Sequence, residues 1–170
     1  MTSHWDTYES PLGPLTLVGR PGVLSGLRFP GKGEPLDEAK RAPGLFADAI
    51  EQLEEYFDGR RRRFELVLDL AGTAFQQRVW SALQAIPYGT TRSYTQVGEA
   101  IDRPDRVRAV GAAVGRTPIP IIVPCHRVVG ADGSLTGYGG GLHRKRALLD
   151  REAGQRRLAD DMQGRQLLLT

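Results

Sequence analysis

The chain contains a single cysteine, Cys125, and its neighbours are residues that could make a thiol reactive. It lies in the stretch IPIIVPCHRVVG, after an apolar run that ends at Pro124 and directly before His126. A thiol is a strong nucleophile only as the thiolate, and an adjacent histidine or cation favours that form. A lone cysteine is, however, more often a buried structural residue. Both interpretations remain open from these residues alone.

His126 can act on Cys125 only under a geometric condition. Consecutive residues of a strand point to opposite faces. The chain must therefore turn at Pro124, or a water must carry the proton between the two side chains. A third group commonly orients such a histidine, and the acids that remain after excluding a turn and the tail are Asp150 and Glu152. Their spacing alone fits an orienting role and a solvated helix charge equally well.

The first 72 residues predict a small α/β domain. Turn signals separate three extended runs within TYESPLGPLTLVG and GVLSGLRF. A helix is predicted in GLFADAIEQLEEYFDG, where apolar residues recur every three or four positions until Gly59. Residues 64–70 alternate in character, as in a half-buried strand.

Residues 73–154 predict a mostly helical domain. Thr73 with Gln76, and Ser93 with Gln96, have the spacing of a capping box at the start of a helix. Pro104 suits the first turn of a third helix. The second and third helices are short and close together, which is typical of a helix-turn-helix whose second helix contacts DNA.

A closing helix is predicted to end at Gly154, and residues 155–170 are expected to form a partly mobile C-terminal tail. Arg144, Lys145 and Arg146, on this helix, could touch phosphate or form a solvated face. The run of four arginines at 60–63 is interpreted as a solvated turn.

Composition and charge exclude several classes of protein. One cysteine permits neither an internal disulfide nor a zinc site built on several thiolates. No apolar run is long enough to span a bilayer, so we expect a soluble, cytoplasmic protein without a membrane partner. Residues 1–73 carry 9 basic and 12 acidic side chains, whereas residues 74–170 carry 14 and 8. The net charges of −3 and +6 indicate that the second part is the one suited to a polyanion.

Five ordered segments resemble the O6-alkylguanine-DNA alkyltransferases, also called methylated-DNA–protein-cysteine methyltransferases: GTAFQQRVW at 72–80, IPYGTTRSY at 86–94, RAVGAA at 108–113, PCHRVVG at 124–130 and LTGYGGGLHRKRALLDREAG at 135–154. ESPLGPLTL near the start extends the similarity to nearly the whole chain. The resemblance implies a ribonuclease H-like N-terminal domain of mainly structural role, followed by a helical domain with a helix-turn-helix.

The same resemblance implies DNA repair by direct reversal. An alkyl group would pass irreversibly from O6-alkylguanine, and from O4-alkylthymine, to the cysteine, with flipping of the base and a single turnover. The implied partner is double-stranded DNA that carries the lesion, bound by a monomer that could cluster on DNA. No cofactor is implied. Some eukaryotic relatives hold a structural zinc in the N-terminal domain, but this chain has no cysteine there, so no metal is predicted.

Five residues match the positions that carry the family's chemistry. Cys125 matches the alkyl acceptor, His126 the histidine that takes the thiol proton through a water, and Glu152 the residue that orients this histidine. Tyr94 matches the tyrosine whose hydroxyl protonates or hydrogen-bonds the guanine as it leaves. Arg108 matches the arginine that fills the space of the flipped nucleotide.

Further positions match residues that contact the base or the DNA. Tyr138, the carbonyls of Cys125 and Val128, and the GYGGG loop match the pocket for the flipped base. The remaining predicted contacts are Ser93, Ala109, Gly111, Arg127 and Gly139.

The chain departs from the family pattern at two of its positions. Thr117 stands where an asparagine usually braces the helix-turn-helix against the active-site strand, and a hydroxyl offers fewer hydrogen bonds than an amide. Gly139 stands where some members have a serine that donates to the O6 atom. Its backbone N–H could donate instead, and the smaller residue could widen the range of alkyl groups.

Two other functions would use some of these residues. A lesion-binding protein without transfer activity would recognise alkylguanine but would not need Cys125. A thiol redox or hydrolytic enzyme could use Cys125, His126 and Glu152, but it would leave Arg108 and Tyr94 without a role.

Overall fold

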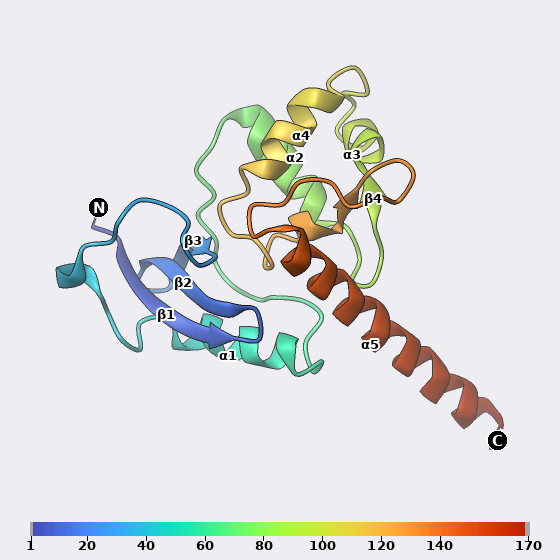
Figure 1. Cartoon of the computed structure of the whole chain (residues 1–170), viewed down its shortest axis with the longest axis horizontal. Helices are drawn as coiled ribbons and strands as arrows, with labels where there is room; N and C mark the ends of the chain where they lie inside the picture. The colour runs from blue at the N-terminus through green and yellow to red at the C-terminus, as the bar shows by residue number, and fades with distance from the viewer. Residues whose placement is uncertain (1, 169–170) are drawn as a thin grey trace.

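The N-terminal part of the chain forms three antiparallel strands in the computed structural model. The structure describes residues 2–168, and within the last helix it describes side chains only up to residue 155. Strands β1 (His4–Ser10), β2 (Gly13–Arg20) and β3 (Val23–Arg28) lie in the order β1-β2-β3. A single 3-10 turn, η1 (Glu38–Lys40), precedes helix α1 (Ala47–Phe57), which packs beside the sheet (Figure 1). Leu15 and Leu17 of β2 and Leu53 of α1 are fully buried between these elements.

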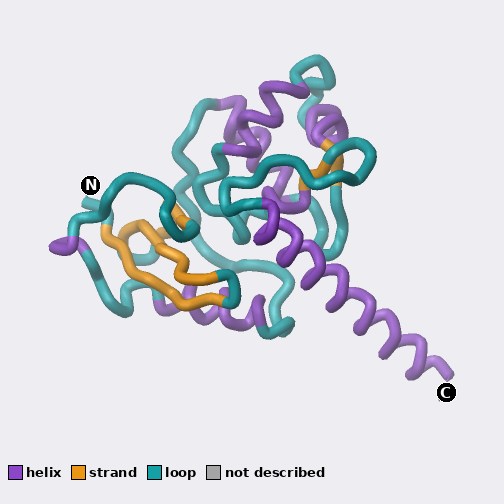
Figure 2. Tube along the Cα trace, viewed as in Figure 1, coloured by secondary structure: helices purple, strands orange, loops and turns teal. Residues whose placement is uncertain are grey.

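The predicted end of helix α1 is confirmed. Gly59 has a φ of 77°, in the left-handed region that glycine adopts at little cost, and its N–H donates to the carbonyl of Tyr56 at 3.1 Å. The chain then turns away from the helix. Figure 2 shows loop from the end of α1 to the start of α2.

The predicted strand at 64–70 is wrong, although its alternating burial is present. One parallel bridge joins Leu68 to Leu24, with hydrogen bonds from Leu24 N to Val67 O (3.0 Å) and from Asp69 N to Leu24 O (2.8 Å). A ladder cannot extend further along β3, because the N–H of Leu27 donates to Pro118 O at 3.0 Å. The outer edge of β3 is thus bound partly by residues 67–69 of the segment between α1 and α2, and partly by Pro118 of the C-terminal domain.

The C-terminal domain contains helices α2 (Ala74–Gln84), α3 (Tyr94–Ala100) and α4 (Val107–Gly115), which lie together in Figure 1, and a two-stranded parallel sheet of β4 (Arg92–Ser93) and β5 (Val128–Val129). Both predicted capping boxes are confirmed. The Thr73 hydroxyl accepts from Gln76 N at 3.1 Å, and the Ser93 hydroxyl accepts from Gln96 N at 3.1 Å, with the reciprocal bonds also present.

Helix α4 begins three residues later than Pro104 predicts. Asp102 takes a left-handed conformation (φ 58°), and the side chain of Arg103 pairs with Asp105 at 3.2 Å. These residues form a turn that places Pro104 between α3 and α4 rather than in the first turn of α4. The indole N–H of Trp80 in α2 donates to Ala113 O at 2.8 Å and holds the buried face of α4.

Helix α5 (Leu142–Leu168) does not end at Gly154 as predicted. The φ of Gly154 is not positive, so this residue continues the helix instead of capping it. A glycine inside a helix costs only about 0.5–1 kcal/mol relative to alanine, and the neighbouring Glu152, Ala153 and Gln155 are strong helix formers. The predicted tail is therefore helical through Leu168, and residues 169–170 lie outside the described residues. None of the helices described is long and apolar enough to cross a bilayer.

Candidate active site

The segment before Cys125 is a buried turn rather than a strand. Ile121 has a φ of 73°, an unusual value for a β-branched residue, and Pro120 bridges to Val123. The chain turns again at Pro124, and Cys125–Arg127 forms the 3-10 turn η2. A turn at Pro124, one of the two alternatives under which His126 could assist Cys125, is therefore present.

His126 and Glu152 meet in the interior. Nε2 of His126 lies 2.7 Å from Oε2 of Glu152, and the two side chains are 0% and 1% exposed. Burial by itself raises the pKa of Glu152, but hydrogen bonds and charges from His126 and Arg127 outweigh it and lower the pKa to about 2. Glu152 is therefore ionised at neutral pH. Asp150, the other acid left open by the sequence, is exposed.

The tautomer of His126 follows from this contact. An ionised carboxylate only accepts hydrogen bonds, so Nε2 of His126 carries the proton and Nδ1 is left as an acceptor. Burial lowers the pKa of His126 despite the opposing effect of Glu152, which keeps the ring neutral at neutral pH. Nδ1 is buried without a hydrogen-bond partner among the described residues. The imidazole thus presents an unoccupied base.

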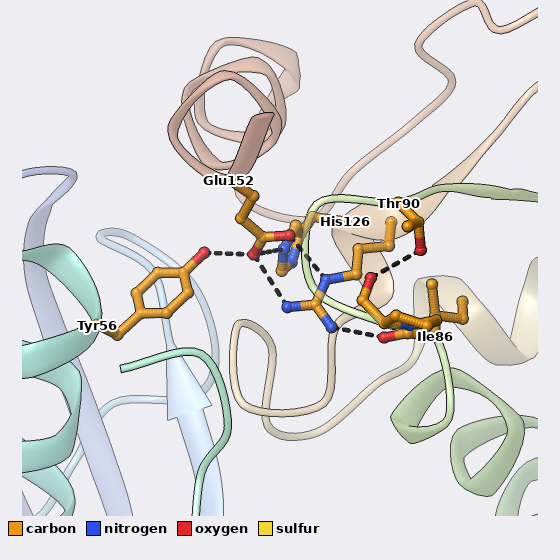
Figure 3. A network of polar contacts seen from close by, with 7 residues as sticks. Tyr56, Ile86, Thr90, His126 and Glu152 are labelled. Atoms are coloured by element: carbon orange, nitrogen blue, oxygen red, sulfur yellow. Dashed lines mark hydrogen bonds and ion pairs between the residues drawn. The ribbon is translucent and has the colours of Figure 1, made fainter. Parts of the chain in front are cut away.

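Arg127 donates hydrogen bonds to both carboxylate oxygens of Glu152. Its Nε donates to Oε1 at 2.7 Å, its Nη2 to Oε2 at 3.1 Å, and its Nη1 to Ile86 O at 2.7 Å. The residue is 6% exposed. Because every one of these nitrogens faces a protein oxygen in the interior, the prediction that Arg127 contacts DNA is wrong. The hydroxyl of Tyr56 also donates to Oε2 of Glu152, at 2.6 Å (Figure 3).

We refer to Tyr56, His126, Arg127 and Glu152 as the buried polar cluster. Sequence reasoning missed the first of these, because a tyrosine three residues after Leu53 in a helix is indistinguishable from an ordinary core residue. Tyr56 and Glu152 are 96 positions apart, and no local pattern links them.

The thiol of Cys125 is protonated at rest. Burial raises its pKa to about 11, against the hydroxyls of Thr117 and Tyr138 and the charge of Lys145, all of which lower it. The Tyr138 hydroxyl contributes through proximity, since it makes no hydrogen bond of standard geometry within the described part of the chain. A nucleophilic role for Cys125 therefore requires a base at the moment of reaction.

Lys145 is a second residue that sequence reasoning missed. Its side chain is 1% exposed and its Nζ donates to Thr136 O at 3.2 Å, so it lies on neither a solvated face nor a phosphate-binding face. Its spacing of three from Leu148 and seven from Glu152, both buried, was the available signal. Arg144 also bonds inward, to Leu12 O and Gly140 O, while Arg146 is exposed.

The predicted base pocket lies against the N-terminal domain. The ring of Tyr138 meets that of Phe29 edge-on at 5.6 Å between centroids, and a side chain at Gly140 would collide with Phe29. Gly139, by contrast, faces open space. The backbone of Val128 is buried in β5.

Tyr94 contacts the loop that carries Tyr138. Its hydroxyl is 2.7 Å from Oγ1 of Thr136. A Cβ at Gly111 would lie 3.8 Å from the Tyr94 ring. The ring of Tyr94 in α3 therefore packs against α4 at this glycine. The Ser93 hydroxyl, predicted to contact DNA, caps α3.

The exposed side of α4 carries Arg108, whose side chain has no hydrogen bond or ion pair with any described residue. Ala109 is half-buried beside it. Thr117, just after α4, donates to Val114 O at 2.7 Å and closes the last turn of that helix. The same hydroxyl lowers the pKa of the Cys125 thiol, against the larger effect of burial.

The fold and the site define a two-domain protein in which a small sheet domain packs against a helical domain that contains a buried cysteine, histidine and glutamate beside a pair of short helices. Two family models match the chain: 6-O-methylguanine DNA methyltransferase, ribonuclease-like domain, over residues 3–70, and 6-O-methylguanine DNA methyltransferase, DNA binding domain, over residues 74–154.

Known proteins agree with this match. The chain is 54% identical over 154 residues to the methylated-DNA–protein-cysteine methyltransferase of Mycobacterium bovis, covering 88% of this chain and 92% of the relative. The crystal structure of the Mycobacterium tuberculosis O6-methylguanine methyltransferase aligns with a TM-score of 0.85 at 51% identity, over 91% of this chain and 94% of the other. A structure of the M. tuberculosis OGT in complex with DNA aligns with a TM-score of 0.86 at 53% identity, over 89% and 94%. The chain belongs to the 6-O-methylguanine DNA methyltransferase family, which confirms the resemblance and the predicted two-domain fold.

Proposed function

We propose that this protein repairs double-stranded DNA by transferring the alkyl group of O6-alkylguanine to the sulfur of Cys125. The observation that carries the proposal is the buried His126, whose Nε2–H faces ionised Glu152 while Nδ1 remains without a partner among the described residues. Such a histidine can accept the proton that a thiol with a pKa of about 11 retains at neutral pH. The names of the relatives above support the same reaction.

The proposed step is a displacement at the alkyl carbon. The sulfur forms a bond to this carbon as the bond from the carbon to O6 breaks, and the electron pair of the broken bond moves onto the guanine. The thiol proton passes to Nδ1 of His126 through a water. The hydroxyl of Tyr94 donates a proton to the leaving base and later recovers one, so that the net exchange is one proton of the protein for one alkyl group.

The product on Cys125 is a thioether, for which the site provides no hydrolytic group among its described residues. Each molecule should therefore react once and then remain alkylated. The same displacement is available at O4-alkylthymine, because the alkyl carbon is again bonded to an exocyclic oxygen of the base.

The base must leave the duplex to reach the sulfur, because Cys125 is only 5% exposed and lies below the protein surface. We propose that α4 lies on the DNA and that Arg108 occupies the space of the extruded nucleotide. Its exposed position and its lack of a partner within the described residues support this role. Tyr138, the Val128 carbonyl and Gly139 would then hold the base. Because the substrate is DNA, we expect the protein to act in the compartment that holds DNA.

Intact-mass measurement tests the reaction directly. The protein is incubated with a duplex that contains O6-methylguanine, and we expect the mass of one methyl group on the protein, located to Cys125 by peptide mapping, with no more than one group per molecule. A duplex containing unmodified guanine serves as the control. Binding of the methylated duplex without any added mass would instead favour the lesion-binding protein, and turnover of small thiol substrates without DNA would favour the redox or hydrolytic enzyme.

A further inference from the structure

The N-terminal domain reaches into the buried polar cluster through one side chain. Tyr56 of α1 is 0% exposed, and its hydroxyl donates to Oε2 of Glu152 on α5 at 2.6 Å. Figure 3 shows the ring of Tyr56 pointing from its helix toward the carboxylate, with His126 on the far side. The oxygen that accepts from Tyr56 is the same one that accepts from Nε2 of His126.

We propose that Tyr56 is a positioning residue of alkyl transfer: its hydroxyl fixes the Glu152 carboxylate, and the carboxylate in turn fixes the imidazole of His126. The inference rests on the proposed function, since it concerns the base that would accept the Cys125 proton. It gives the N-terminal domain a part in the reaction beyond the mainly structural role expected from the sequence.

Packing makes Tyr56 a rigid donor. Its ring contacts Phe57, Phe64 and Tyr88, with centroids 5.2, 5.5 and 6.2 Å away. A tyrosine ring has few rotatable bonds, so these neighbours leave its hydroxyl one position. Burial, together with the charge of Glu152, raises the pKa of Tyr56 well above its ordinary value. The hydroxyl therefore remains protonated and always donates.

The geometry at Glu152 explains why this donor matters. Oε2 accepts from Tyr56, from His126 and, at 3.1 Å, from Arg127. Arg127 approaches from η2, the same turn that carries His126, whereas Tyr56 approaches from the other domain. Among the residues whose side chains are described, only Tyr56 binds the Glu152 carboxylate from an element other than η2, the turn whose His126 the carboxylate has to orient. A second hydrogen bond between α5 and α1, from the Arg151 side chain to the carbonyl of Phe57, holds the end of α1 next to Glu152.

The test compares Tyr56→Phe with Tyr8→Phe. The first variant keeps the ring and removes only the hydroxyl at Glu152. The second removes a hydroxyl from another buried tyrosine of the same domain that does not touch the buried polar cluster. Single-turnover transfer is measured with a methylated duplex and with free O6-benzylguanine, and affinity is measured with the duplex. NMR records the Nε2–H proton of His126.

For Tyr56→Phe we expect the maximal transfer rate to fall about tenfold with both substrates, as befits loss of a hydrogen bond to a charged group, while the dissociation constant for the duplex stays within about twofold. The His126 Nε2–H resonance should move upfield as its hydrogen bond to Glu152 lengthens. Tyr8→Phe should change none of these. A Tyr56→Phe protein with the wild-type transfer rate and an unshifted resonance would overturn the inference.

Two measurements separate this inference from the proposed function and from a folding defect. Wild-type protein that transfers no alkyl group refutes the proposed function whatever Tyr56 does. If Tyr56→Phe does not fold, the wild-type protein still provides the test, because the Tyr56 hydroxyl proton and the His126 Nε2–H proton share one acceptor oxygen. A nuclear Overhauser contact between them is expected, and its absence refutes the positioning role.

Discussion

Glu152→Gln is the change that should most clearly expose the energetics of the site. Glutamine has nearly the shape of glutamate, but its amide offers one oxygen acceptor and brings two N–H donors. Glu152 accepts hydrogen bonds from Tyr56, His126 and Arg127 on its two oxygens. In the variant, at least one of these donors faces another donor, and the guanidinium of Arg127 loses its counter-charge in the interior.

The magnitude follows from the pKa. Glu152 titrates at about 2 in the folded protein, against an ordinary value of 4.5. Each unit corresponds to about 1.4 kcal/mol, so the carboxylate contributes about 3 kcal/mol to the free energy of unfolding at neutral pH. Removing one member of a buried ion pair typically costs about 3–5 kcal/mol, which agrees. Out of a total stability of about 5–15 kcal/mol, this is a large fraction.

The sign of the pH dependence is fixed by the lowered pKa. The contribution of Glu152 is fully present above its unfolded value of 4.5 and is lost as pH falls through about 2. The difference in unfolding free energy between wild type and Glu152→Gln should therefore be about 3 kcal/mol at pH 7 and about half of that at pH 3. Urea denaturation followed by tryptophan fluorescence measures it, with buried Trp80 as a probe.

Asp150→Asn is the matched control, since Asp150 is exposed two residues earlier on the same helix. We expect its unfolding free energy to stay within about 0.5 kcal/mol of the wild type. The reasoning fails if Glu152→Gln costs less than about 1 kcal/mol at pH 7, or if its cost does not shrink in acid. Glu152→Gln should also slow alkyl transfer, whereas Asp150→Asn should not.

Three further predictions concern the chemistry and the DNA contact. Cys125→Ser should abolish alkyl transfer and keep duplex affinity, measured by intact mass and by fluorescence anisotropy; a parallel loss of affinity would show that the cysteine mainly supports the fold. Arg108→Ala should slow repair of a methylated duplex far more than reaction with free O6-benzylguanine, and equal slowing of both would contradict its role in base extrusion. Lys145→Met removes a positive charge that lowers the thiol pKa, so the pKa of Cys125 should rise further above about 11 and the pH–rate profile should move to higher pH. Arg146→Met, at an exposed neighbour, should leave that profile unchanged, and an unmoved profile in Lys145→Met would refute the electrostatic effect.

The sequence by itself determined the features that depend on residues a few positions apart. Thr73 and Ser93 each cap a helix through a residue three positions on, and Gly59 ends α1 through its own backbone conformation. The turn signals between the extended runs likewise separate strands β1, β2 and β3. Such bonds form within one turn of chain, so their pattern is visible in the sequence without knowledge of the fold.

Neighbouring residues and long-range packing decided the elements for which a single local signal was weak or misleading. Gly154 lies within a helix whose other residues favour helix, and Pro104 lies in a turn shaped by Asp102. Residues 64–70 have the alternation of a strand, but the edge of β3 is already partly occupied by Pro118. In each case the conformational preference of one residue or short segment was outweighed by the preferences and contacts of the residues around it.

The site shows the same division. The sequence places Cys125 beside His126 and, through the family resemblance, points to Glu152. Only the tertiary structure turns the chain at Pro124 and brings Tyr56 onto the carboxylate from 96 positions away. Whether a polar side chain such as Lys145 or Arg127 faces water or the interior depends on what the other elements place over it, because the cost of burying a charge is met by partners distant in the chain.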